Sequence, residues 1–173
     1  MTTSMMRIQP ILLAAGLLVS AASADSSLNG KDLEFVNSSA QAGNTEVEFG
    51  RLAAQKSTNS LVRDFANRMI SDHSKIDLNL TALATSKGVK LPAGKGLEND
   101  AKYLELKILS GKEFDEAYVR AMVDDHKGDV SSFQKEREDA QDADVKRFAA
   151  KTLPMLQDHL RRIEKIQAEM DSK

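Results

Sequence analysis

The stretch Met69-Ile70-Ser71-Asp72-His73 decides how this chain folds, because its pattern, Met-x-x-Asp-His, occurs three times. It returns as Met122-Val123-Asp124-Asp125-His126 and as Met155-Leu156-Gln157-Asp158-His159, and the three copies contain all three histidines of the chain. Residues four positions apart lie on one face of an α-helix. Each copy therefore presents a thioether and an imidazole to the same neighbour, with a carboxylate beside them. In the first two copies the histidine stands where the inner stripe of a helix would carry an apolar residue.

Apolar residues at helical spacing predict four long helices, over residues 32–56, 60–87, 112–139 and 144–171. Residues 88–111 between the second and third helices contain Pro92, Gly94 and Gly96 and a short predicted helix over 99–109. This connection is longer than those that join antiparallel neighbours, so it predicts a crossover from one end of the bundle to the other. Pro154 predicts a kink or a split in the last helix, near Thr152. The predicted fold class is all-α, a ferritin-like four-helix bundle of two helical hairpins joined by a long crossover containing a short helix.

Residues 1–24 read as a signal peptide for export. Arg7 precedes a mostly apolar run over residues 8–19, and Ala22-Ser23-Ala24 offers small residues for cleavage before Asp25. The run is shorter than the roughly 20 apolar residues that a spanning helix needs, and we expect no transmembrane segment in the mature chain. The expected domains are the signal peptide, 1–24, and a single helical-bundle domain, 25–173. The expected location is the periplasm if the source is a Gram-negative bacterium.

Composition excludes some functions and leaves others open. The 173 residues carry a net charge of −2 and no clustered basic face, so we expect no nucleic-acid partner. There is no cysteine, so the core must support the fold without disulfides. We find no dedicated nucleophile, and the chain is more simply explained as a binding protein than as an enzyme. Protein partners, and the choice between monomer and homo-oligomer, stay open.

The first hypothesis is a metal site inside the bundle. Its candidate ligands are His73, His126 and His159 from three different helices, with Glu46, which falls on the buried face of the first helix, as a fourth. Three imidazoles and a carboxylate suit a zinc ion, whereas added thioethers would favour copper. The residues that could add ligands or orient the imidazole rings are Met69, Met122, Met155, Asp72, Asp125, Asp158 and Asp77. Metal storage, sensing or buffering outside the cytoplasm would follow.

The second hypothesis is a structural, interaction or envelope-stress module without a metal. In it each Asp-His pair forms a buried hydrogen-bonded network that fixes how the helices pack. Such pairing should raise the pKa of each imidazole in the folded state, so histidines that titrate below their ordinary value would count against it. A third hypothesis uses the same histidines as a pH or stress sensor.

Several stretches of the mature chain match the pattern of a known family, and they are Phe35-Val36, Glu46-Val47-Glu48-x-Gly50-x-Leu52-Ala53, Val62-x-x-Phe65-Ala66-x-x-Met69-x-x-Asp72-His73, Gly111-x-x-Phe114-Asp115-x-x-Tyr118, Met122-x-x-Asp125-His126 and Thr152-Leu153-Pro154-x-Leu156-x-x-His159-Leu160. Together they resemble a bacterial family of exported helical domains, called domain of unknown function 4142. The resemblance covers nearly the whole mature chain and implies a ferritin-like four-helix fold and export; members are often labelled outer-membrane proteins. It implies no activity. The pattern departs from ferritin-like di-iron enzymes, whose histidines follow a glutamate three residues earlier, because Ile70, Val123 and Leu156 occupy those places.

Overall fold

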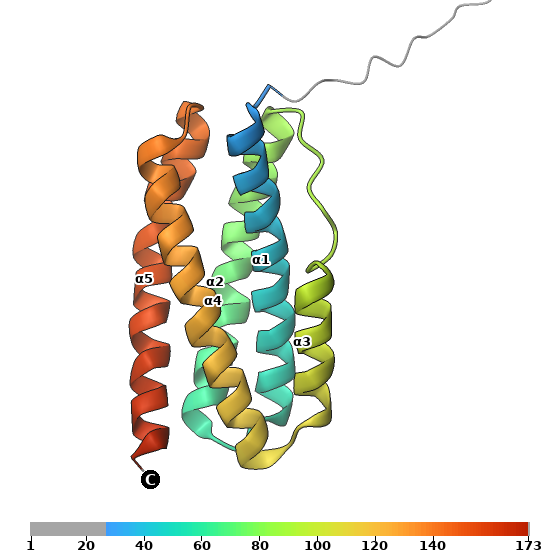
Figure 1. The fold of residues 1–173 in the computed structure, drawn as a ribbon, viewed down its shortest axis with the longest axis vertical. Helices are drawn as coiled ribbons and strands as arrows, with labels where there is room; N and C mark the ends of the chain where they lie inside the picture. Colours follow the sequence, from blue (N-terminus) through green and yellow to red (C-terminus); the bar gives the residue numbers. More distant parts are fainter. Residues whose placement is uncertain (1–26, 173) are drawn as a thin grey trace, which may run out of the picture.

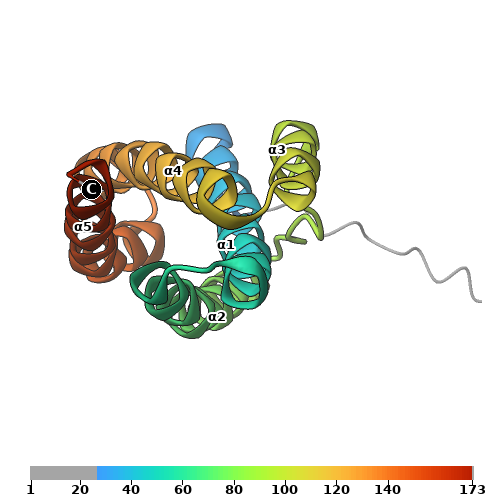
Figure 2. The same cartoon turned by 90° about the horizontal axis from the view of Figure 1, so that it is seen from below.

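The computed structural model describes residues 27–172, and these residues form five helices and no strand. The helices are α1 (Gly30–Lys56), α2 (Ser60–Ser86), α3 (Leu97–Ile108), α4 (Gly111–Asp139) and α5 (Ala143–Asp171). Figure 1 shows α1 with α2 as one antiparallel hairpin, α4 with α5 as a second, and α3 beside α1 in the crossover. The view along the bundle in Figure 2 shows the four long helices around one core, with α3 outside it. The predicted bundle of two hairpins and a crossover is confirmed.

The signal peptide predicted over residues 1–24 lies outside the described residues. Of the helices that the structure does describe, none combines the length and the apolar character that crossing a bilayer would require.

Polar side chains cap the N-termini of three of the long helices. The side chain of Asn29 accepts hydrogen bonds from the first amides of α1, Asn59 accepts from the Leu61 amide of α2, and Asp142 accepts from the first amides of α5. These contacts satisfy backbone N–H groups that have no partner within the helix. At the other end of α2, Gly88 adopts a φ of 67°, which favours glycine and allows the chain to turn away.

Pro154 does not split the last helix, because α5 is one continuous helix from Ala143 to Asp171. Proline removes one backbone N–H and crowds the carbonyl four residues earlier, which here belongs to Ala150. Both Pro154 and Ala150 are exposed. Water can therefore solvate the carbonyl that loses its helical partner, and packing of the buried face holds the helix together.

A polar layer divides the core into two apolar clusters. The first contains Phe49 of α1, Met69 of α2, Phe114 of α4 and Ile163 of α5. The second cluster contains residues of α1 as far as Ala40 and residues of α2 from Ile76 onward. It also contains residues of α4 from Phe133 onward and residues of α5 as far as Leu156. Between the two clusters each long helix carries one buried titratable residue, and these are Glu46, His73, His126 and His159.

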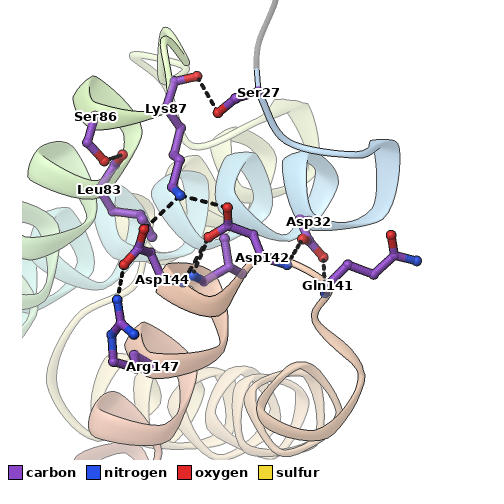
Figure 3. Close-up of polar contacts among 10 residues, drawn as sticks. Ser27, Asp32, Leu83, Ser86, Lys87, Gln141, Asp142, Asp144 and Arg147 are labelled. Atoms are coloured by element: carbon purple, nitrogen blue, oxygen red, sulfur yellow. Dashed lines mark hydrogen bonds and ion pairs between the residues drawn. The ribbon is translucent and has the colours of Figure 1, made fainter.

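Partly exposed ion pairs and a buried aspartate join the two hairpins at the end of the bundle where α2 ends and α5 begins. Lys87 Nζ lies 2.6 Å from Asp142 Oδ2 and 2.7 Å from Asp144 Oδ2, as Figure 3 shows. In the same figure Asp32, which is buried, accepts hydrogen bonds from the backbone amides of Gln141 and Asp142. These contacts connect α1 and the end of α2 to the start of α5, and so hold one hairpin at a defined height against the other.

Within the first hairpin, Gly50 allows α1 to approach α2 closely. A Cβ atom at this position would lie 3.0 Å from the Ala66 carbonyl oxygen and 3.1 Å from Ile70 Cγ1. In contrast, a Cβ atom at Gly128 of α4 would meet no atom within 4 Å.

These two glycines make a matched pair of stability tests. Alanine in place of a mid-helix glycine stabilises by roughly 0.5–1 kcal/mol, whereas overpacking costs about 1–3 kcal/mol. We expect Gly50→Ala to lower the free energy of unfolding by about 1 kcal/mol, because the new methyl group presses on the α2 backbone. Gly128→Ala should raise it slightly. Urea denaturation followed by circular dichroism measures both, and a stabilised Gly50→Ala variant would contradict the close approach.

Candidate metal centre

The three histidines of the repeated motif meet inside the bundle. His73 on α2, His126 on α4 and His159 on α5 each bring one ring nitrogen to within 4.8 Å of the other two. Their ring centroids are 5.8 Å apart for His73 and His126, and 5.4 Å apart for each of the other two pairs. The side chains are 2%, 0% and 0% exposed. Phe65 of α2 packs edge-on against His126 and His159 and forms an apolar wall beside the cluster.

Hydrogen bonds assign the protons on two of the rings. His126 Nδ1 lies 2.9 Å from the Met122 carbonyl oxygen, which only accepts, so Nδ1 carries the proton. His159 Nε2 lies 3.2 Å from Asp72 Oδ2 and donates to that carboxylate. The remaining nitrogens, His126 Nε2 and His159 Nδ1, are buried lone-pair donors without a partner, and His73 Nε2 is also buried and unpartnered. Each ring therefore keeps one nitrogen available for coordination, and a carboxylate or carbonyl orients two of the rings.

Burial keeps the imidazoles neutral. Desolvation, with smaller contributions from the neighbouring histidines, lowers the pKa of His126 to about 4 and that of His73 well below its ordinary value. Desolvation also lowers the pKa of His159, although its hydrogen bond with Asp72 works in the opposite direction. The expectation that Asp-His pairing would raise these pKa values is therefore wrong, because loss of hydration outweighs the single carboxylate contact. Neutral imidazole is the form that binds a metal ion.

Glu46 lies beside the histidines rather than among them. Its Oε1 is 3.6 Å from His126 Nδ1, the nitrogen that already donates to Met122, while Oε2 is buried and unpartnered. The side chain is 1% exposed, and desolvation, with smaller contributions from Asp129 and Asp125, raises its pKa well above the ordinary value. This buried carboxyl is therefore held protonated unless a positive charge reaches it.

The acidic residues of the motif do not orient the histidines that follow them. Asp72 bonds to His159, which belongs to another copy of the motif. Asp158 turns outward and pairs with Arg162 and other arginines. Asp125 has an unpartnered buried oxygen, and desolvation raises its pKa to about 6. The repeated Asp-His network of the second hypothesis is thus replaced, among the described residues, by one contact between helices α2 and α5.

The remaining predicted residues divide between the interior and the surface. Met69 and Met122 are fully buried in the apolar cluster next to the histidines, whereas Met155 is 36% exposed. Asp77 is half-buried, with one carboxylate oxygen packed over Gly43, and burial raises its pKa to about 6. The oxygen over Gly43 has no hydrogen-bond partner among the described residues.

Two groups near the site are absent from the sequence-based candidates. Asp129 follows Asp125 by one turn of α4, and desolvation followed by repulsion from Asp125 raises its pKa to about 7. The hydroxyl of Tyr118 is buried and unpartnered, and its pKa is raised well above the ordinary value by desolvation and then by Glu46 and Asp125. The four-residue spacing of Asp125 and Asp129 was the only sequence signal, and it is also typical of solvated helix faces.

A family model matches residues 17–166, and its description is domain of unknown function, DUF4142. The chain belongs to this family. The match spans all four long helices almost completely and confirms the resemblance that the motifs carry. A search of curated proteins gave no match.

Solved structures share the fold of this DUF4142 chain at low sequence identity. A DUF305 fragment from Deinococcus radiodurans superposes with a TM-score of 0.73 and 17% identity, covering 82% of this chain and 98% of that one. A DUF305 protein from Streptomyces coelicolor, named as a putative secreted protein, superposes with a TM-score of 0.69 and 16% sequence identity. The match covers 82% of this chain and 94% of that one. CopM in its Cu(II)-bound form superposes with a TM-score of 0.63 and 13% sequence identity. The match covers 80% of this chain and 96% of that one. At these identities the likeness establishes the helical fold.

The buried imidazoles predict a specific pH dependence of stability. A folded-state pKa below the unfolded value means that the unfolded chain binds more protons, so stability is present above pH 6.5 and is lost as the pH falls toward 4. For His126 alone the loss is about 3 kcal/mol. Asp125 and Asp129, whose pKa values are raised, act in the opposite direction.

Comparison with a His126→Leu variant isolates the histidine from these acids. Between pH 6.5 and 4 the metal-free wild type should lose about 3 kcal/mol more unfolding free energy than the variant. In an NMR titration, the pH dependence of the imidazole chemical shifts should give a pKa below 6.5 for each of the three histidines. Rings that titrate at or above 6.5 would refute the burial argument.

Proposed function

We propose that this protein binds one transition-metal ion inside the bundle, through His73, His126 and His159. The observation that carries the proposal is the convergence of three neutral, fully buried imidazoles, each with an unpartnered ring nitrogen. An unpaired buried polar nitrogen costs on the order of 1–3 kcal/mol, and three together have no structural benefit unless something binds them. A zinc–nitrogen bond of about 2 Å places ligand nitrogens roughly 3.3 Å apart in a tetrahedral site. Small rotations of the rings would close the present spacing to that value.

Copper and zinc are the ions that this ligand set suits. Imidazole accepts both, and the copper-selective thioethers of Met69 and Met122 lie buried in the adjoining cluster. The shared fold with Cu(II)-bound CopM supports testing copper first. Glu46, at the first helix, and Asp72, bonded to His159, would supply the negative charge that balances the ion.

The proposed role is storage, buffering or sensing of the ion outside the cytoplasm rather than catalysis. Export is inferred from the signal-like residues 1–24, and the secreted name of one structural neighbour is consistent with it. The competing function is a packing module, and the observation that favours it is the Asp72–His159 contact across α2 and α5. That function gives the free nitrogens of the other two histidines no purpose.

Metal titration of untagged protein separates these functions. We expect isothermal calorimetry to show one Cu²⁺ or Zn²⁺ ion per chain, bound far more tightly than millimolar. The variants His73→Gln, His126→Gln and His159→Gln each remove one proposed ligand. Each should weaken metal affinity by at least roughly 10–100-fold, which is the loss typical when only a residue that orients a ligand is removed. The matched control is Asp158→Asn, which changes the third copy of the motif at an outward-facing residue and should leave affinity unchanged.

Thermal unfolding provides an independent reading. A hundredfold excess of ion over the dissociation constant should stabilise the wild type by about 2.7 kcal/mol, and a chelator should reverse the gain. The packing function instead predicts that a His→Leu variant loses the same stability with and without the chelator. Equal losses, together with millimolar or absent binding, would end the metal proposal.

A further inference from the structure

An acidic pocket opens at the seam between α1 and α4, next to the histidine cluster. Its volume is about 270 Å³, enough for a partly hydrated cation. Three aspartates of α4 contribute to the lining, and Asn99 at the start of α3 and Gly128 complete its rim. The lining residues are Ala42, Thr45, Glu46, Asn99, Asp124, Asp125, Gly128 and Asp129.

Glu46 belongs both to this pocket and to the environment of the histidines. It lines the pocket, yet its Oε1 lies 3.6 Å from His126 Nδ1. Its other oxygen is fully buried and has no hydrogen-bond partner among the described residues. The Glu46 carboxyl therefore lies between the acidic opening and the His126 ring, and its unpartnered oxygen is placed to receive a cation from the pocket.

The pocket in the opposite seam of the bundle, between α2 and α5, is of mixed charge. The pocket there contains the cationic residues Arg68, Arg162 and Lys165 around an apolar floor that includes Phe65 and Ile166. Asp64 and Glu169 also line it, so its cations exceed its acids by one. Arg68 further pairs with Asp72 in front of His159. A metal cation approaching the histidines through this seam would meet the carboxylates of Asp72, Asp158 and Glu169, which already pair with arginine or lysine, and would have to pass beside an aromatic ring.

We propose that the acidic pocket is the port through which the metal ion reaches and leaves the histidine cluster, with Glu46 as the carboxylate that passes it on. This inference rests on the proposed function. Oxygen ligands replace water around a cation in small steps, so a row of carboxylates lowers the barrier to dehydration before the imidazoles take over. Gly128 keeps the wall of the port open, because it has no side chain and a Cβ there would meet nothing within 4 Å.

A port and a binding site give different kinetic signatures. Narrowing a port slows association and dissociation by the same factor and leaves the dissociation constant unchanged, because only the barrier between the two states rises. Loss of a ligand instead weakens the equilibrium affinity. Measuring both rates for one variant therefore distinguishes the two roles.

The decisive variants are Gly128→Leu and Gly128→Phe, with Gly128→Ala as the matched control. Stopped-flow mixing with Cu²⁺ or Zn²⁺, whichever calorimetry shows to bind more tightly, gives association rates, and excess chelator gives release rates. At pH 7.5 the bulky variants should slow both rates at least tenfold with dissociation constants within threefold of the wild type. The association and dissociation rates of Gly128→Ala should both stay within twofold of the wild-type rates.

Charge and location are tested separately. Asp124→Asn combined with Asp129→Asn should lower the association rate several-fold and flatten its dependence on salt. Leu61→Phe adds bulk to the pocket in the opposite seam and should change neither rate.

Unchanged rates in both bulky Gly128 variants, with normal wild-type affinity, would overturn the port while leaving the metal site intact. Slowing by Leu61→Phe alone would also overturn it, because it would place the route at α2 and α5. Wild-type protein that binds no ion would instead refute the proposed function, and the port with it.

Discussion

Desolvation of four polar side chains at the middle of an apolar bundle is the constraint on which the rest of the structure depends. Each long helix contributes one of them, Glu46, His73, His126 or His159, and water is excluded from all four. A charged imidazole in this layer would be strongly destabilised, so the rings are neutral and the carboxyl of Glu46 tends to hold its proton. The apolar clusters above and below the layer must supply the stability that these groups remove.

The height at which the two hairpins meet determines whether the layer forms at all. Contacts within a hairpin are extensive, but α2 meets α5 and α1 meets α4 along narrower seams. Lys87 with its two aspartates, and Asp32 with the turn before α5, hold the hairpins together at one end. One helical turn is about 5.4 Å, comparable to the separation of the histidine rings, so a slip of one turn would disperse the cluster. Ion pairs remote from the site thereby serve to align it.

Membership of DUF4142 and the shared fold with DUF305 proteins and CopM describe a scaffold, and the chemistry is specific to the side chains placed on it. Ferritin-like di-iron enzymes fill the same interior with glutamates as well as histidines. Here Ile70, Val123 and Leu156 take the places three residues before each histidine. The metal proposal therefore names copper or zinc and not paired iron ions, because three imidazoles and one neighbouring carboxyl are softer and less charged than a di-iron ligand set.

The sequence by itself determined the helices, the crossover and the identity of the three histidines. Helical periodicity and the length of residues 88–111 are local signals, and they predicted the architecture correctly. Only the tertiary structure decided that Asp72 pairs with His159, that Met155 and Asp158 face outward, and that α5 continues through Pro154. The physical reason is that periodicity specifies which face of a helix is buried, whereas the rotation and height of one helix against another arise from packing between distant segments. The acidic pocket beside Glu46 likewise exists only because α1, α3 and α4 meet there.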